Sequence, residues 1–322
     1  MHHRPFGNTS LNVSEIGHGT WTMGGMWGPR NDRSAINALV KGIELGITFI
    51  DTAAVYGHGH SESLIASAFK EAKQKVSVAT KIPPKNFQWP AQHNIPLEET
   101  FPKKHIIELT EFSLKNLRTD CITLQQLHVW SDQWLEQGDE LFETISLLKK
   151  QGKINYFGIS INDHEPNSAL EVVSSGLIDS VQVIYNIFDQ EPANKLFPLC
   201  QKHGVAVIVR VPLDEGSLTG NITRETSFHK KDWRSRYFTK ERLEETCQHV
   251  DQLRKDTEHL NKPLSHIALQ FCLAHPAVST VIPGMRTIDN VEKNCVVSGD
   301  ALLKEVDLEK IKKHCWKRNF YS

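Results

Sequence analysis

Eight short runs of β-branched residues, separated by longer stretches with helical periodicity, constrain the fold of this chain of 322 residues most strongly. Strands that alternate with helices predict parallel βαβ units. A count of eight favours a closed (β/α)8 TIM barrel over an open, doubly wound sheet. The expected strands cover residues 13–19, 47–53, 76–82, 121–129, 154–160, 180–186, 205–212 and 278–284.

Helical patterns fill the intervals between these runs. In residues 34–45, for example, Ile36, Leu39 and Ile43 fall on one face of a helix. No sequence of the form G-x-G-x-x-G follows an early strand, which argues against a dinucleotide-binding Rossmann domain. The other expected helices cover residues 105–117, 140–150, 165–175, 191–203 and 263–274.

Two segments lie outside this repeat. Residues 4–14 fit a small β-hairpin with its turn at residues 8–10, and such a hairpin can plug the bottom of the barrel. Residues 213–239 form a long loop after the seventh strand, at the carboxyl-terminal face where barrel enzymes carry their active sites. No interdomain linker is evident, so we expect residues 1–322 to form a single domain of the α/β class.

Charge and cysteine content narrow the class of protein. The net charge of -1 lacks the basic excess of a nucleic-acid binder, and no apolar run approaches the roughly 20 residues of a membrane helix. The N-terminus has no apolar stretch typical of a secretory signal, and the six cysteines include no C-x-x-C pair. We therefore expect a cytoplasmic protein with reduced thiols and without a metal, nucleic-acid or membrane partner. The sequence gives no indication of an oligomeric state.

Ionisable side chains follow the second, third and fourth expected strands. Asp51 and Tyr56 come at and after the end of the second strand, and Lys81 stands at the end of the third. His128 lies near the end of the fourth strand. Because the carboxyl ends of barrel strands meet at one mouth, we expect these four side chains to share a site.

This set of side chains suits the reduction of a carbonyl group. Tyr56 can donate the proton, and the ammonium group of Lys81 is expected to lower the pKa of the phenol, with Asp51 holding Lys81 in place. His128 can donate a hydrogen bond to the substrate oxygen and support its developing negative charge. The hydride must come from a cofactor, since no side chain donates one.

The sequence resembles the aldo-keto reductase family along nearly its whole length. The resemblance implies a (β/α)8 barrel whose catalytic tetrad is Asp51, Tyr56, Lys81 and His128. It also implies NADPH-dependent reduction of an aldehyde or ketone, a small-molecule substrate. The matching stretches are IGHGTW (16–21), DTAAVYG (51–57), ATK (79–81), QQLH (125–128), GIS (158–160), VQVIYN (181–186) and VIPG (281–284).

The resemblance also implies residues that bind the nicotinamide half of NADP(H). Gln182 and Ser160 match the family's partners of the nicotinamide amide. Arg210 stands where many members carry an aromatic residue that stacks on the nicotinamide, and an arginine plane can also stack. Asn162 lies one position after the family's asparagine, because Ile161 takes that place.

The remaining cofactor residues follow from the same resemblance. Arg286 corresponds to the arginine that meets the adenosine 2′-phosphate, which implies NADPH rather than NADH. A helix beginning near Thr287 would favour a phosphate group. Residues expected under the pyrophosphate are Leu213, Gly216 and Leu218, and the other cofactor residues are Gly284, Asn290 (where glutamine is usual) and the adenine-binding Asn294.

Trp21, Trp27 and Trp130 are expected to form walls of the substrate pocket. Aromatic walls suit an aliphatic or aryl aldehyde, and they also suit the apolar faces of a sugar or keto-sugar.

Three other functions are weighed against this one. A cofactor-binding regulatory or sensor protein would keep the same residues with little turnover. A Schiff-base aldolase would need a neutral Lys81, whereas Asp51 favours the charged form. A metal site at His58 and His60 is disfavoured, because the pair follows the second strand and the later strand ends offer few ligands.

Overall fold

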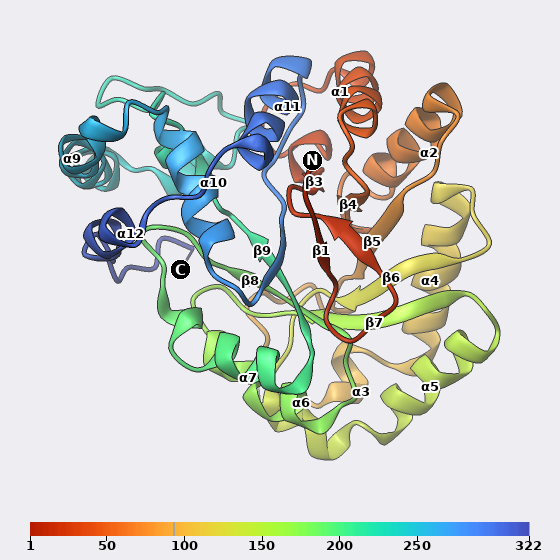
Figure 1. The fold of residues 1–322 in the computed structure, drawn as a ribbon. Coiled ribbons are helices and arrows are strands. Elements are labelled where there is room, and N and C mark those ends of the chain that lie inside the picture. Colours follow the sequence, from red (N-terminus) through yellow and green to blue (C-terminus); the bar gives the residue numbers. More distant parts are fainter. Residues whose placement is uncertain (93, 322) are drawn as a thin grey trace.

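Eight parallel strands form a closed barrel in the computed structural model, which describes residues 1–92 and 94–321 (Figure 1). The strands pair in chain order from β3 to β10. Parallel bridges between Ile16 and Val281 and between Gly19 and Gly284 close the ring, so the predicted (β/α)8 barrel is confirmed. The barrel strands are β3 (His18–Gly19), β4 (Phe49–Asp51), β5 (Ser77–Ile82), β6 (Ile122–Leu127), β7 (Ile154–Ser160), β8 (Ser180–Ile184), β9 (Ala206–Arg210) and β10 (Val278–Val281).

Helices surround the strands, and those expected from the sequence are present. The helices after β4 and after β9 were not expected. The first, α2, is rich in serine and alanine, and the second, α9, is so highly charged that its apolar stripe of Leu243, Val250 and Leu253 is sparse. The helices are α1 (Asp32–Glu44), α2 (His60–Ala72), α3 (Leu97–Thr100), α4 (Lys103–Leu117), α5 (Asp139–Lys150), α6 (Leu170–Ser175), α7 (Leu196–His203), α8 (Arg234–Tyr237), α9 (Lys240–Thr257), α10 (Leu264–Ala274), α11 (Ile288–Cys295) and α12 (Glu305–Lys312).

Helix α1 shows how local sequence sets these elements. The side chain of Asn31 caps its N-terminus by accepting a hydrogen bond from the backbone N–H of Ser34, at 3.0 Å. Leu39 and Ile43, four residues apart, are buried on the face toward the barrel. Gly46 follows the helix with a φ of 93°, which only glycine adopts readily, and turns the chain into β4.

The N-terminal hairpin is present and takes over part of the predicted first strand. Strand β1 (His3–Pro5) pairs antiparallel with β2 (Asn12–Ser14), and only His18–Gly19 of the predicted 13–19 strand pairs with β4. The residues between β2 and β3 pair with β10 instead: the N–H of Gly17 donates to the carbonyl of Val281 at 2.8 Å, and the N–H of Val281 donates to the carbonyl of Glu15 at 2.9 Å.

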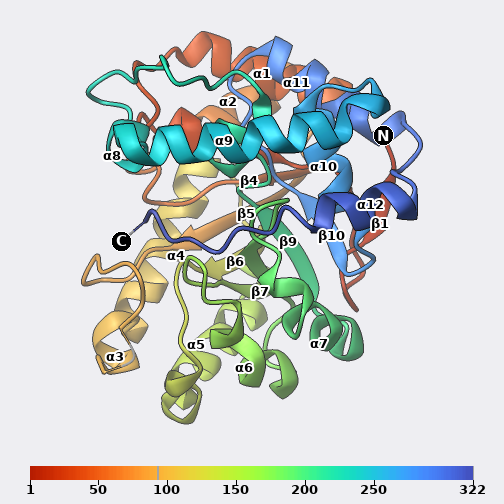
Figure 2. The ribbon, with the colours of Figure 1, turned by 90° about the vertical axis from the view of Figure 1, so that its left-hand side faces the viewer.

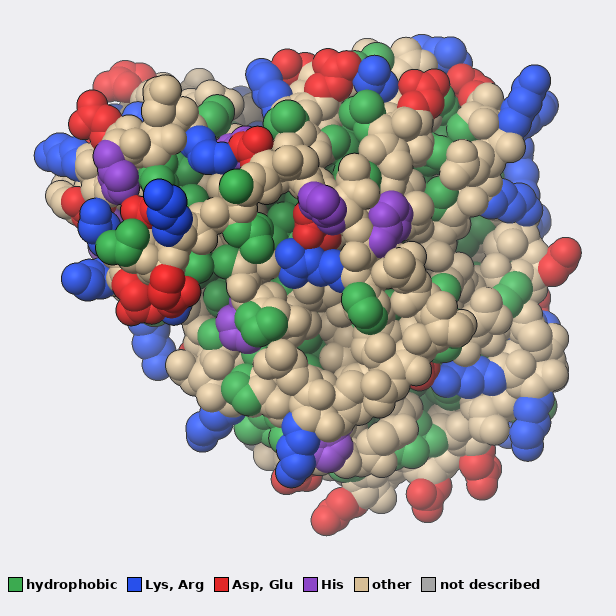
Figure 3. All heavy atoms as spheres, viewed as in Figure 1, with side chains coloured by type: hydrophobic (Ala, Val, Ile, Leu, Met, Phe, Trp, Pro, Cys, Tyr) green, Lys and Arg blue, Asp and Glu red, His purple; other side chains and the backbone are tan. Residues whose placement is uncertain are grey.

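Phe6 of the hairpin closes the amino-terminal end of the barrel. Its ring is fully buried and lies 5.5 Å from the ring of Phe49. The same apolar cluster contains Leu124 of β6, Ala206 of β9 and Ile282, which directly follows β10. The hairpin therefore plugs the barrel bottom, and the opposite end remains for a site. Figure 3 shows acidic and basic side chains interspersed on the face that carries the hairpin.

The carboxyl-terminal face carries the longest loop and the C-terminal segment. The loop after β9 leads through α8 to α9, and residues after α12 run beside α9 toward the C-terminus (Figure 2). Among the described residues, none of the helices combines the length and the apolar character of a transmembrane span. The single-domain organisation of residues 1–322 stays a prediction.

Replacing Phe6 by alanine should lower the free energy of unfolding by about 3–5 kcal/mol, because it leaves a cavity beneath the barrel. Urea denaturation measures this loss. Leu302→Ala, at a side chain that is 51% exposed, serves as the control and should change stability by less than about 0.5 kcal/mol. A loss below about 1 kcal/mol for Phe6→Ala would show that the hairpin does not plug the barrel.

Candidate active site

A buried ion pair lies at the centre of the barrel mouth. Lys81, in β5, and Asp51, at the end of β4, are both buried, and Lys81 Nζ lies 2.6 Å from Asp51 Oδ1. The ammonium group also donates to the backbone carbonyl of Thr52, at 2.7 Å. Parallel pairing of β4 with β5 places the two residues on adjacent strands, so the barrel itself sets their separation.

The second carboxylate oxygen of Asp51 is held by two glutamines. Gln182 Nε2, from β8, donates to Asp51 Oδ2 at 2.7 Å, and Gln126 Nε2, from β6, donates at 3.5 Å. Side chains from strands β5, β6 and β8 thus converge on one carboxylate. Gln126 was not predicted as a site residue, although it lies two positions before His128.

Tyr56 and His128 complete the group expected from the sequence. The ring centroid of Tyr56 lies 5.2 Å from Lys81 Nζ and 5.9 Å from the ring of His128. Trp89, from the loop after β5, packs edge-on against His128 at 5.7 Å. The structure therefore brings Asp51, Tyr56, Lys81 and His128 together at one mouth, with Trp89 as an aromatic neighbour that the sequence did not indicate.

The pKa of Tyr56 differs from the expectation. Burial of the phenol raises its pKa well above the ordinary value, and the charge of Asp51 raises it further, while the charge of Arg210 lowers it. The expected lowering by Lys81 is not found, because burial of the phenol dominates and the charge of Asp51 adds to it. Tyr56 is therefore protonated at neutral pH, which is the form that a proton donor needs.

His128 is held in its neutral form. Burial lowers its pKa well below the ordinary value, and the charges of Lys81 and Arg210 lower it further. A neutral imidazole can still donate a hydrogen bond from its N–H to a carbonyl oxygen.

A second charged pair lies beside the tetrad. Arg210, at the end of β9, donates to Asp163 Oδ1 at 2.7 Å and to the backbone carbonyl of Ile161 at 2.9 Å. The neighbouring Asn162 accepts from the backbone N–H of Ala91 at 2.9 Å, so it ties the loop after β7 to the loop after β5. Asp163 was not expected at the site. The cofactor role assigned to Asn162 stays a prediction.

The residues expected at the adenosine end lie near the start of α11. Thr287 caps this helix, accepting from the N–H of Asn290 at 3.2 Å. The guanidinium group of Arg286 donates to the backbone carbonyl of Trp27 at 2.7 Å. Asn294 is buried in the same helix, whereas Gly284, which forms the bridge to Gly19, is exposed. The helix N-terminus predicted near Thr287 is thus present.

Aromatic side chains from two loops pack together over the mouth. Trp21 contacts Trp27 edge-on at 5.9 Å and Trp233 at 5.4 Å. The guanidinium group of Arg234 lies 3.8 Å from the ring centroid of Trp27. Trp130 does not belong to this group, because it is fully buried and packs against Trp134 at 6.1 Å.

The loop after β3 and the loop after β9 are joined through their backbones. Trp27 forms an antiparallel bridge with Asp232, and the N–H of Trp233 donates to the carbonyl of Met26 at 3.0 Å.

The remaining predicted cofactor residues lie at this mouth as well. Ser160 is buried at the end of β7, and Leu213, Gly216 and Leu218 form the turn after β9.

The two loop histidines have separate neighbours. His58 packs against the ring of Phe112 at 5.2 Å, and His60 pairs with Asp32 at 2.9 Å. Across residues 1–92 and 94–321, no cluster of three or more His, Cys, Asp or Glu side chains is arranged to hold a metal ion.

Comparison with known proteins identifies the family. The family model described as the Aldo/keto reductase family matches residues 15–315. The chain therefore belongs to the aldo/keto reductase family, whose members are oxidoreductases that act on carbonyl compounds.

Individual relatives cover nearly the whole chain. It is 31% identical to the aldo-keto reductase YhdN of Bacillus subtilis (strain 168), over 95% of this chain and 91% of that protein. It is 27% identical to the NADH-specific methylglyoxal reductase of Escherichia coli (strain K12), over 90% and 91% of the two chains. Among solved structures, the holo form of aldo-keto reductase AKR11C1 from Bacillus halodurans matches with a TM-score of 0.77 and 30% identity, over 98% and 96%.

Asp51→Asn should lower the free energy of unfolding by about 3–5 kcal/mol, because it leaves the ammonium group of Lys81 buried without a counterion. The double variant Asp51→Asn/Lys81→Met removes both charges and should be clearly more stable than the single variant. Urea denaturation of wild type, both single variants and the double variant measures the coupling between the two residues. Additive losses would contradict the central role given to the ion pair.

Proposed function

We propose that this protein reduces an aldehyde or ketone to the alcohol with NADPH as the hydride source and Tyr56 as the proton donor. The observation that carries the proposal is the convergence of Tyr56, His128 and the Lys81–Asp51 ion pair at the barrel mouth. A neutral imidazole beside a protonated phenol offers two hydrogen-bond donors to one carbonyl oxygen.

The residues at the mouth fit a bound nicotinamide nucleotide. Buried polar atoms without a partner in the described part of the chain include His128 Nδ1, Arg210 Nε and Gln126 Oε1, all near strand ends. Such atoms suit a polar ligand, because an unsatisfied buried polar group is costly. The nicotinamide ring, when bound, supplies the hydride. Gln182 and Ser160 would hold its amide, and Arg210 would lie against its face.

The side chains then have distinct tasks. His128 orients the carbonyl through an N–H hydrogen bond, and the phenol of Tyr56 gives its proton to the developing alkoxide, which is a stronger base than a phenolate. Lys81 lies beside the phenol, where its ammonium group can stabilise the phenolate that remains. Asp51, held by Gln182, keeps Lys81 in position.

The preference for NADPH rests on Arg286. Arg286 directly precedes Thr287, the N-cap of α11, and a phosphate there would be favoured by both an arginine side chain and the helix end. One relative of this chain is an NADH-specific methylglyoxal reductase, so the two cofactors are compared in the Arg286 test below.

The walls of the mouth favour a polar substrate such as a sugar or keto-sugar. Trp21 and Trp27 offer apolar faces, while Arg210 and Asp163 offer hydrogen-bonding groups beside the tetrad. Trp130 as a third wall stays a prediction, as does a cytoplasmic location. A regulatory role without turnover gains no specific support from the site.

Tyr56→Phe should abolish carbonyl-dependent oxidation of NADPH, because the phenyl ring fills the same space without a proton to give. The loss in kcat should be at least about 100-fold, the lower end of general-acid contributions. Absorbance of NADPH with a panel of aldehydes, ketones and sugars measures turnover, and protein fluorescence measures NADPH binding. Retained binding with lost turnover supports the proposal. Unchanged turnover would remove Tyr56 as the donor, and no binding by the wild type would refute the proposed function.

Arg286→Met should weaken NADPH binding by roughly 10- to 100-fold, the range expected for one lost charge-assisted contact. The affinity for NADH should stay within about threefold, since NADH lacks the 2′-phosphate. Titration calorimetry with both cofactors separates the two effects. Equal weakening of both would show that Arg286 stabilises the site without reading the 2′-phosphate.

A further inference from the structure

The turn after β9 carries two buried carboxylates at the place proposed for the cofactor's pyrophosphate. Asp214 and Glu215 lie between Leu213 and Gly216, and each is only 4% exposed. Like charges a few ångströms apart in a protein repel strongly when water does not screen them. Two carboxylates would therefore oppose an anionic ligand unless other groups offset their charges.

Asp214 is offset by Arg318. The two side chains form an ion pair in which each is 5% exposed, and Ser217 Oγ donates to Asp214 Oδ2 at 2.6 Å. The guanidinium group of Arg318 lies 4.3 Å from the ring centroid of Trp316 and 5.4 Å from that of Phe188. These rings fix the position of the charge, so Asp214 carries a permanent counterion.

Glu215 has no counterion among the described residues, and burial rather than an ion pair offsets its charge. The hydroxyl of Tyr321 donates to Glu215 Oε1 at 2.5 Å, and the Tyr321 ring stacks on Trp233 with centroids 5.5 Å apart. Burial raises the pKa of the Glu215 carboxyl to about 8, although the hydrogen bond from Tyr321 lowers it. Glu215 is therefore mostly protonated, and thus neutral, at pH 7.

The backbone of the turn depends on its surroundings too. Asp214 and Glu215 have φ values of 48° and 53°, in the left-handed region that side chains other than glycine rarely adopt. Such residues persist where neighbouring contacts fix them. Here those contacts come from Arg318 and Tyr321, which lie 104 and 106 positions away along the chain.

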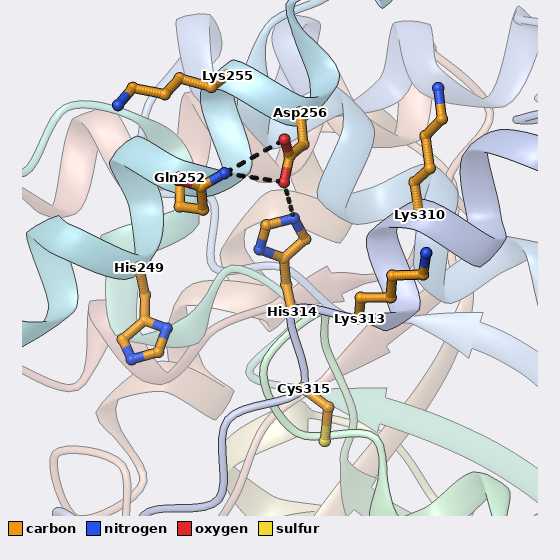
Figure 4. Close-up of a pocket in the computed structure, with 8 residues that line it drawn as sticks. All are labelled: His249, Gln252, Lys255, Asp256, Lys310, Lys313, His314 and Cys315. Atoms are coloured by element: carbon orange, nitrogen blue, oxygen red, sulfur yellow. Dashed lines mark hydrogen bonds and ion pairs between the residues drawn. The ribbon is translucent and has the colours of Figure 1, made fainter.

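The C-terminal segment, residues 314–321, is itself anchored on α9. His314 Nε2 lies 3.1 Å from Asp256 Oδ2, and the ring of Trp316 stacks on His249 with centroids 4.0 Å apart. Figure 4 shows His249, Asp256 and His314 around a surface pocket of about 670 Å³, outside the barrel mouth. The segment then continues beside α9 to the turn after β9 (Figure 2).

Resting on the proposed function, we propose that the C-terminal segment is part of the cofactor site. Arg318 is a positioning residue that offsets the charge of Asp214 and so cancels its repulsion of the cofactor's pyrophosphate, while Tyr321 holds the buried side chain of Glu215 in place. The segment thereby makes an acidic turn able to hold an anion.

Titration calorimetry of NADPH binding to the whole chain tests this proposal through a double-mutant cycle. Arg318→Met leaves the charge of Asp214 unpaired and should raise the Kd by about 10- to 30-fold. The double variant Asp214→Asn/Arg318→Met removes that charge and should return the Kd to within about threefold of wild type. Asp214→Asn alone should bind as tightly as wild type or tighter, which keeps the test valid if Arg318→Met does not fold.

Arg242→Met is the matched control. Arg242 donates to the backbone carbonyl of Phe320 at 3.0 Å, so the variant loosens the same segment but leaves both carboxylates paired. Its melting temperature should fall while its Kd stays within about twofold of wild type. The proposal is overturned if Arg242→Met and Arg318→Met weaken NADPH binding equally. It is also overturned if the Kd of the Asp214→Asn/Arg318→Met variant does not return toward that of the wild type. If the wild type binds no NADPH, both the proposed function and this proposal about the C-terminal segment are refuted.

The pH dependence of binding supplies a second readout. Glu215 loses its proton as the pH rises through about 8, so the Kd for NADPH should rise between pH 7 and pH 9 in the wild type. In Glu215→Gln the Kd should not follow this rise, because the amide does not ionise. Equal slopes in the two proteins contradict the proposal. The charged or titratable groups that face Glu215 are Asp163, Arg210, Asp214 and Tyr321.

Discussion

The ion pair between Lys81 and Asp51 sets the geometry on which the rest of the site depends. Both groups are buried, and Asp51 is further held by Gln182 and Gln126, so its carboxylate has little freedom to move. A buried ion pair contributes little to stability compared with apolar packing, but removing one partner is costly. The ion pair matters here for the geometry of the site, because it fixes an ammonium group beside the ring of Tyr56 without leaving a net charge there.

Charge compensation recurs around the barrel mouth. Three arginines near the mouth have acidic partners, and each of these pairs joins segments that are distant in the chain or fixes a turn in the loop after β9. Trp233 is a shared contact of this surround, since it packs against both Trp21 and Tyr321. The loop after β3, the loop after β9 and the C-terminal segment therefore form one connected rim. The pairs are Arg210–Asp163, Arg234–Asp232 and Arg318–Asp214.

Much of this arrangement could be predicted because its signals are local. Alternating β-branched runs reveal strands, and a residue such as Asp51 at a strand end is placed by the barrel rather than by its own contacts. Helix α9 escaped prediction because its few apolar residues are hidden among charges. The charge balance of the site could not be predicted from the sequence, since the pKa of Tyr56 depends on the burial of the phenol and on the charges of Asp51 and Arg210 around it. Contacts such as Tyr321 with Glu215 join distant positions, and no spacing in the chain reveals them.

Direct hydride transfer is tested by following the isotope from NADPH that carries deuterium at both C4 positions of the nicotinamide to a carbonyl substrate. Mass spectrometry of the alcohol locates the label. We predict one deuterium on the carbinol carbon, delivered from one face of the nicotinamide, with the hydroxyl proton coming from water through Tyr56. An unlabelled alcohol, or NADPH consumption without any reduced product, would contradict direct hydride transfer at this site.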